Sequence, residues 1–270
     1  MLTRRCWLAV IGITTCFQVS PAKSQSNNPN ALWQIVHRLC VPHQAQFGTP
    51  LPCAAVDRTG GYAILKDIRG ATQFLLIATA HVTGIEDPAI LEPDAPNYWQ
   101  AAWDATNLVQ AEANLALPRD DLSLAINSVQ GRTQNQLHIH IDCIRADVRD
   151  TLRRHATAIV DSWTPFPFPL STHRYQAIRV KTLDRPGATP FQLLADQLPG
   201  ARADMGAETL IAVGATFEDG EPGFYLLAGR ADIAAGNRGA AEELQDHSCA
   251  VARAATPRLV GAPGAASNSQ

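Results

Sequence analysis

Residues 137–144 alternate apolar and polar side chains and bring together groups that can do chemistry. The polar members are His138, His140 and Asp142. In a β-strand, alternate residues point to the same face of the sheet, so these three side chains share one face while their apolar neighbours enter the core. An imidazole can bind a metal, act as a nucleophile or be an ordinary polar group. The strand therefore has three interpretations.

In two of these interpretations, the histidines are either ordinary polar residues or metal ligands. On an exposed face, the histidines would be polar residues without chemistry. As metal ligands, His138, His140 and Asp142 would offer imidazole and carboxylate to zinc, in a secreted metal-binding module. His-x-His-x-Asp also begins the motif of metallo-β-lactamase-like hydrolases, but that motif continues with a histidine where this chain has Cys143.

The third interpretation is covalent catalysis on a phosphoanhydride. A histidine can attack phosphorus when its Nδ1–H is held by a backbone carbonyl, because the Nε2 lone pair is then free near neutral pH. Residues 127–136, just before the strand, form a polar, glycine-containing turn. Its backbone N–H groups, hydroxyl and amides would bind phosphate oxygens.

The strand and turn resemble the histidine-triad superfamily of nucleotide hydrolases and transferases, whose signature is three alternating histidines after a Gly-x-Ser/Thr turn. Aligning that turn with Gly131–Thr133 puts the three histidine positions at Gln136, His138 and His140. The resemblance implies that His138 is the nucleophile, although glutamine replaces the first histidine. An alternative register would make His140 the middle member and Asp142 the third.

The same resemblance implies a set of substrate contacts. Asp67 corresponds to an acid that binds ribose hydroxyls, and Asn127 to an asparagine that contacts phosphate. Lys66 or Arg132 would steer the second phosphate. The complete set of expected substrate-binding residues is Lys66, Asp67, Asn127, Gly131, Arg132, Thr133 and Gln136.

More narrowly, the chain resembles the bacterial CDP-diacylglycerol pyrophosphatases from about Leu32 to Cys249. The resemblance implies hydrolysis of CDP-diacylglycerol to CMP and phosphatidate through a cytidylyl-histidine, with His138 and His140 catalytic and with no metal or cofactor. The implied partner is a phospholipid at a membrane surface; the alternative is a histidine-triad hydrolase or phosphotransferase for soluble nucleotides. The ordered blocks that carry this resemblance are residues 61–67, 122–128, 131–135, 138–149 and 242–249.

Composition fits this expectation. The 270 residues are 46% hydrophobic and carry a net charge of −3, so the chain can build a core but has no basic field for nucleic acid. The expected fold is α+β, a histidine-triad-like antiparallel sheet flanked by helices, within a domain spanning residues 31–250. A strand, turn, strand and helix occur in the same order at residues 62–116 and 210–249, which suggests a degenerate second half.

Periodicity locates the elements of this fold. It predicts a loop at residues 40–59 and a stiff, proline-punctuated connector, Trp163–Leu170, that either dips into lipid or packs as a linker. Strands are predicted at residues 62–66, 74–78, 122–126, 137–144, 210–216 and 224–228. Helices are predicted at residues 31–39, 97–116, 146–160, 190–197 and 238–249.

The two ends of the chain have their own signatures. Residues 1–24 combine Arg4 and Arg5 with an apolar stretch and a small-residue site, which is typical of an export signal or, if uncleaved, of an N-terminal membrane anchor. The expected location is the periplasm or the periplasmic face of the inner membrane. Residues 251–270 are rich in Ala, Pro, Gly and Ser and are predicted to be disordered.

Four cysteines follow the predicted signal: Cys40, Cys53, Cys143 and Cys249. An even number suits an oxidising compartment and allows three pairings. Cys40 and Cys53 bracket a short loop that a disulfide could close at low entropic cost. We therefore favour Cys40–Cys53 with Cys143–Cys249 over four free thiols.

Overall fold

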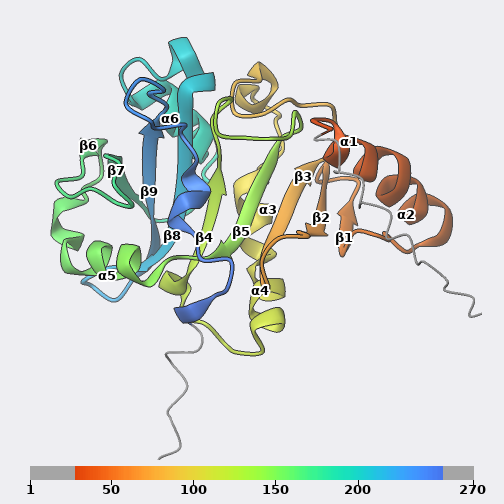
Figure 1. Cartoon of the computed structure of the whole chain (residues 1–270), viewed down its shortest axis with the longest axis horizontal. Helices are drawn as coiled ribbons and strands as arrows, with labels where there is room; N and C mark the ends of the chain where they lie inside the picture. Colours follow the sequence, from red (N-terminus) through yellow and green to blue (C-terminus); the bar gives the residue numbers. More distant parts are fainter. Residues whose placement is uncertain (1–27, 252–270) are drawn as a thin grey trace, which may run out of the picture.

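The computed structural model describes residues 28–251, which fold around one antiparallel sheet. The strand order is β1-β2-β3-β5-β4-β8-β9-β7-β6, which runs from right to left in Figure 1. The predicted α+β class is confirmed. The strands are β1 (Ala55–Asp57), β2 (Tyr62–Lys66), β3 (Phe74–Ala78), β4 (Leu122–Ile126), β5 (His138–Cys143), β6 (Thr164–Pro165), β7 (Gln176–Val180), β8 (Glu208–Thr216) and β9 (Pro222–Arg230).

Short helices cover both faces of the sheet. The α-helices are α1 (Ala31–Ile35), α2 (Val41–Phe47), α3 (Tyr98–Asp104), α4 (Thr106–Ala113), α5 (Ala146–Arg154) and α6 (Pro190–Gln197). A π-helical turn, η1 (Val36–Cys40), joins α1 to α2. The 3-10 turns are η2 (Pro88–Leu91), η3 (Arg119–Asp121), η4 (Ala156–Ala158), η5 (Arg202–Ala207) and η6 (Ala241–Leu244).

One face of the sheet carries the largest hydrophobic cluster. Ile139 and Ile141 of β5 point into it and pack with Trp99 of α3 and Phe191 of α6. This is the alternation predicted for the strand, because the intervening histidines must then face the other way. In Figure 1, α3 and α4 lie behind the sheet and the dark-blue C-terminal segment crosses in front of it.

The opposite face carries two smaller clusters with a gap between them. One packs α1 and η1 on β2 and β3 through residues such as Leu32 and Leu75. The other packs α5 and η6 on the neighbouring strands β4, β8, β9 and β7, for example through Leu152 and Leu227. Neither cluster includes His138 or His140. The side chains of His138 and His140 instead line a cavity that the two clusters leave between them.

Several predicted elements differ from the structure. The predicted 97–116 helix is broken at Ala105 into α3 and α4, and the predicted 146–160 helix ends at Arg154. The predicted loop at residues 40–59 contains α2, which accommodates Pro42 in its first turn. Strands β1, β6 and β7 were not predicted. β1 and β6 are the two edge strands and β7 lies next to β6, in the parts of the sheet where the hydrophobic pattern is weakest.

The predicted 238–249 helix is wrong, because only η6 is helical there. The backbone that follows η6 is instead bound by tertiary hydrogen bonds. The N–H of Asp246 donates to the Cys143 carbonyl at 2.9 Å, and the N–H of Ala71 donates to the His247 carbonyl at 2.8 Å. These bonds replace the helical ones, which local periodicity cannot reveal.

The two halves of the sheet repeat one topology. The first half has the spatial order β2-β3-β5-β4 and the second has β6-β7-β9-β8, and they meet at the β4–β8 pair. Helices connect the second strand to the third in each half. The similar units are therefore β2–β5 and β6–β9, whereas the sequence had suggested residues 62–116 and 210–249.

Trp163–Leu170 is a packed connector. Phe166 is buried in the cluster beneath α5, and Phe168 stacks on His155 with ring centroids 3.8 Å apart. The Trp163 indole N–H donates to the Leu193 carbonyl. This packing favours the linker interpretation of the segment, while Phe168 is 39% exposed, so contact of the segment with lipid stays a prediction.

Both disulfides of the favoured pairing are present, Cys40–Cys53 and Cys143–Cys249, and such bonds are typical of an oxidising compartment. The predicted signal or anchor at residues 1–24 lies outside the described residues. So does the predicted tail, apart from Val251, which is buried. Within residues 28–251, no helix has the length and apolar character needed to cross a bilayer.

Candidate active site

A pocket of about 570 Å³ occupies the gap between the two smaller clusters. This volume is within the range, roughly 300–1,000 Å³, typical of small-molecule sites. β5 supplies His138 and His140 to its floor, and the β2–β3 connection and the C-terminal segment form two of its walls. The polar and charged lining residues are Lys66, Asp67, Arg69, Gln73, Asn127, Thr133, Gln134, His138, His140, Glu242, Glu243, Gln245 and His247.

His138 has the tautomer that a nucleophile needs. Its Nδ1 lies 2.7 Å from the Gln136 carbonyl oxygen, and because a carbonyl only accepts, Nδ1 must carry the hydrogen. The Nε2 lone pair is then left free. The residue is only 7% exposed, and burial, reinforced by the nearby His140, lowers the pKa of His138 to about 4. The ring is therefore neutral across the physiological range.

His140 is held by different groups. Its ring centroid lies 5.0 Å from that of His138, and its Nδ1 lies 2.7 Å from the Gln73 amide nitrogen and 3.1 Å from a Glu242 carboxylate oxygen. Burial is the main cause that lowers the pKa of His140 to about 4. The Nε2 atom is buried and has no hydrogen-bond partner within the described chain. A buried polar atom without a partner is costly, so a ligand atom would stabilise it.

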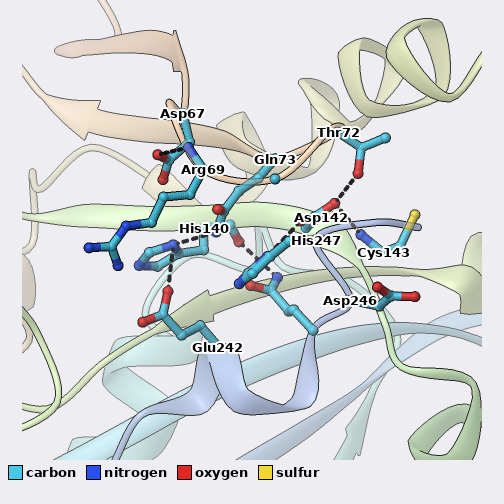
Figure 2. Close-up of polar contacts among 12 residues, drawn as sticks. Asp67, Arg69, Thr72, Gln73, His140, Asp142, Cys143, Glu242, Asp246 and His247 are labelled. Carbon is cyan, nitrogen blue, oxygen red and sulfur yellow. Dashed lines mark hydrogen bonds and ion pairs between the residues drawn. The ribbon is translucent and has the colours of Figure 1, made fainter. Parts of the chain in front are cut away.

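A third imidazole belongs to the pocket. Asp142 is fully buried, and its Oδ1 accepts hydrogen bonds from the Thr72 hydroxyl at 2.6 Å and the Cys143 N–H at 2.9 Å. Its Oδ2 lies 2.9 Å from Nδ1 of His247. The hydrogen bond to Asp142 raises the pKa of His247 above its usual value. Figure 2 shows His247 beside Asp142, on the same side of β5 as His140 and Glu242.

The C-terminal segment is attached directly to β5. The Gln245 side-chain amide donates to the carbonyl oxygens of Ser123 and His140, each at 3.2 Å. The Cys143–Cys249 disulfide adds a covalent link at the end of the strand. Glu242 and His247 are thereby brought to the histidines of β5, although both lie more than a hundred positions after His140 in the chain.

Four of the predicted substrate-binding residues line the pocket: Lys66, Asp67, Asn127 and Thr133. The Lys66 ammonium donates to the Asp67 and Gly70 carbonyls at 3.1 and 3.3 Å. The Asp67 carboxylate accepts the Arg69 N–H at 2.9 Å. Both charged groups are therefore held at the mouth of the pocket by the β2–β3 connection.

Gly131 and Arg132 do not line the pocket. The Gly131 N–H donates back to Ser128, and a Cβ at Gly131 would lie 2.6 Å from the Gly239 carbonyl oxygen, so only glycine fits there. The Arg132 guanidinium makes a two-pronged ion pair with Glu86, at 2.5 and 2.7 Å. These N–H groups are therefore used within the protein and do not form an open cradle for phosphate.

Gln136, at the position of the missing first histidine, also lies off the pocket. Its amide nitrogen donates to the Ala78 and Ala80 carbonyls, both at 2.7 Å. Its side-chain oxygen is buried without a partner. Since both amide hydrogens are used, the side chain holds the end of β3 against β5.

The geometry gives no support to a metal centre on β5. Asp142, one of the three ligands in that interpretation, is instead bonded to Thr72 and His247. Among the residues that the structure describes, no three His, Cys, Asp or Glu side chains are arranged to hold a metal ion.

Sequence reasoning missed Arg69, Gln73, Glu242 and His247 as pocket residues. One signal could have found two of them. The favoured Cys143–Cys249 pairing already implied that residues just before Cys249 lie beside the end of the histidine strand. His247 and Glu242 could have been proposed on that basis.

The comparisons with known proteins agree with one another. A family model described as CDP-diacylglycerol pyrophosphatase matches residues 27–253. A protein named CDP-diacylglycerol pyrophosphatase from Yersinia pestis is 40% identical over 229 residues, covering 85% of this chain and 87% of the relative. The matched region contains every residue that lines the pocket.

Proposed function

The chain belongs to the CDP-diacylglycerol pyrophosphatase family and hydrolyses CDP-diacylglycerol, and from that premise we propose that His138 is the nucleophile of the reaction. One observation carries the proposal: the Nδ1–H of His138 donates to the Gln136 carbonyl, which leaves the Nε2 lone pair free in a ligand-sized pocket. A low pKa keeps this nitrogen unprotonated at neutral pH.

The reaction takes two steps. The Nε2 lone pair of His138 forms a bond to the phosphorus of the CMP moiety, and the bond from that phosphorus to the bridging oxygen breaks. The oxygen keeps the electron pair and leaves on phosphatidate. Water then attacks the cytidylyl-histidine: its oxygen stays on CMP, a proton is released and Nε2 recovers its lone pair. The Gln136 carbonyl stabilises the charged imidazole between the steps.

The other pocket residues bind and orient the substrate. We assign the ribose hydroxyls to Asp67, and the phosphoryl oxygens to His140, Asn127 and Thr133, with Lys66 near the second phosphate. The unpartnered Nε2 of His140 supports its assignment. Gly131, Arg132 and Gln136 contribute by holding the turn and the strand in place.

The same pocket suggests how the lipid approaches. Its apolar lining comes from Leu32, Ile35, Leu65 and Ile68, and the last is 88% exposed. A group of apolar side chains that continues to an exposed residue beside a lipid-hydrolysing site favours contact with a membrane surface. We infer that the β2–β3 connection faces the bilayer. This apolar lining favours the lipid substrate over soluble nucleotides.

Export would place this activity on the outer side of the inner membrane. The two disulfides and the charged and apolar character of residues 1–24 support a periplasmic location, either by a cleaved signal or by an anchor.

The nucleophile is tested by trapping the intermediate. With CDP-diacylglycerol labelled in the cytidylyl phosphate, acid quenching of the wild-type reaction should leave acid-labile label on His138. His138→Ala should form no labelled protein and lose more than about 10³-fold in kcat. His155→Ala, outside the pocket, is the control and should keep both properties. A labelled or fully active His138→Ala protein would refute the mechanism, and activity that is lost in EDTA and restored by zinc would favour a metal site.

A further inference from the structure

The proposed function assigns no role to His247, the third imidazole of the pocket. His247 lines the pocket, its side chain is 35% exposed, and Asp142 occupies its Nδ1 at 2.9 Å. We propose that His247, oriented by the buried Asp142, binds the second phosphate of CDP-diacylglycerol through its Nε2–H and stabilises the departing phosphatidate. This inference rests on the proposed function, because it assigns a role within the same reaction.

The geometry fixes which atom is available. Oδ1 of Asp142 accepts from the Thr72 hydroxyl and from the Cys143 N–H, and Oδ2 lies 2.9 Å from Nδ1 of His247. The carboxylate therefore accepts the Nδ1–H of His247, and Nε2 is the ring nitrogen left for a ligand. This is the arrangement in which a carboxylate orients an imidazole and stabilises its positive charge.

The charged groups around His247 favour the imidazolium. The pKa of His247 is raised chiefly by the hydrogen bond to Asp142 on β5, with smaller contributions from Glu242 on η6 and Asp67 in the β2–β3 connection, and it is lowered by burial. Lys66 and Arg69 line the same pocket and oppose the positive charge, whereas the lowered pKa of His140 keeps that ring neutral. A bound diphosphate adds negative charge and reinforces the protonated form.

His247 can stabilise the departing phosphatidate without transferring a proton to it. When the P–O bond breaks, the bridging oxygen carries its electron pair away on phosphatidate. The Nε2–H of His247 donates a hydrogen bond to an oxygen of that phosphate, which gains negative charge as it leaves. The interaction is therefore stronger in the transition state than in the bound substrate.

The first test compares two leaving groups. His247→Gln should lower kcat/KM for CDP-diacylglycerol by about 10²–10³-fold. It should lower kcat/KM for the 4-nitrophenyl ester of CMP, which has no second phosphate, by less than about tenfold. His155→Gln is the matched control, because His155 stacks on Phe168, with ring centroids 3.8 Å apart, and neither residue lines the pocket. Equal losses on both substrates, or no loss on either, would overturn the inference.

The second test is the pH profile. His247 must be protonated, so activity on CDP-diacylglycerol should fall as the pH rises through its raised pKa, and His247→Gln should lack this alkaline limb. Asp142→Asn removes the main cause of the raised pKa and should move the limb to lower pH. An alkaline limb unchanged in Asp142→Asn would also overturn the inference.

The two proposals fail separately. His138→Ala should be inactive on both substrates whatever His247 does. If His138→Ala remains active, the nucleophile is wrong; if it is inactive but His247→Gln affects both substrates equally, only the role of His247 is wrong.

Discussion

His138 and His140 differ by two positions on one strand, yet their surroundings assign them different chemistry. His138 gives its Nδ1–H to a backbone carbonyl, an acceptor that cannot change its protonation state. His140 contacts Gln73 and Glu242, side chains that can reorient when a ligand binds. The first arrangement suits a nucleophile with a fixed tautomer, and the second suits a group that adapts to an anion.

A second prediction concerns a single residue: we predict that the exposed side chain of Ile68 contacts the membrane that carries the lipid substrate. Ile68→Ser should lower kcat/KM about tenfold or more with CDP-diacylglycerol in anionic vesicles, because each buried methylene contributes about 0.8 kcal/mol. It should leave the rate with a short-chain, monomeric CDP-diacylglycerol unchanged. Ile233→Ser, at another exposed isoleucine outside the pocket, is the control. An equal loss on both forms of the substrate would contradict contact with the membrane.

The C-terminal segment is the element that completes the pocket. It has little secondary structure of its own beyond η6, so its position depends on Gln245, on its backbone contacts and on the Cys143–Cys249 disulfide. Cys143 follows Asp142 directly in the chain, and Cys249 lies two positions after His247. The bond therefore fixes the alignment of two segments that carry functional side chains.

We predict that this disulfide is required for full activity. A Cys143→Ser, Cys249→Ser double variant should lose about 10–100-fold in kcat/KM, because small displacements of catalytic groups are costly. Activity should be measured where near-ultraviolet circular dichroism indicates a folded protein. The Cys40→Ser, Cys53→Ser double variant, which lacks the other bond, should lose less. Full activity in a folded Cys143/Cys249 variant would contradict the prediction.

Across the whole molecule, one row of paired residues shows how the two halves differ. Directly paired residues in an antiparallel sheet point to the same face. The row on the pocket face runs through Leu65, Leu75, His140, Ala125, Ile211, Leu227 and Ala177. In the first half, His140 of this row lines the pocket. In the second half, Leu227 of the same row is packed in a hydrophobic cluster. We therefore propose that the second half supports the structure and that the first carries the chemistry.

Matched substitutions in this row should separate stability from activity. Leu227 is fully buried, so Leu227→Ala should cost about 2–5 kcal/mol in the free energy of unfolding and leave kcat/KM unchanged below the unfolding transition. His140→Ala should lower activity with a smaller loss of stability. Urea unfolding and steady-state kinetics on both variants give the two quantities. A large loss of activity in folded Leu227→Ala would mean that the second half takes part in catalysis.

The sequence by itself determined the central strands, the α+β class, both disulfides and the strand that carries His138 and His140. The strands and the class depend on local periodicity and turn residues, which can be read within short windows. The disulfides depend on the number and spacing of cysteines along the chain. The alternation at residues 137–144 also predicted which side chains of β5 enter the core.

Only the tertiary structure decided which polar groups meet. It brought Glu242 and His247 to β5 and directed Arg132 to Glu86 and Gln136 to the β3 backbone. The physical reason is that the partner of a polar side chain is fixed by its three-dimensional surroundings, because each buried donor and acceptor must be satisfied by whatever lies beside it.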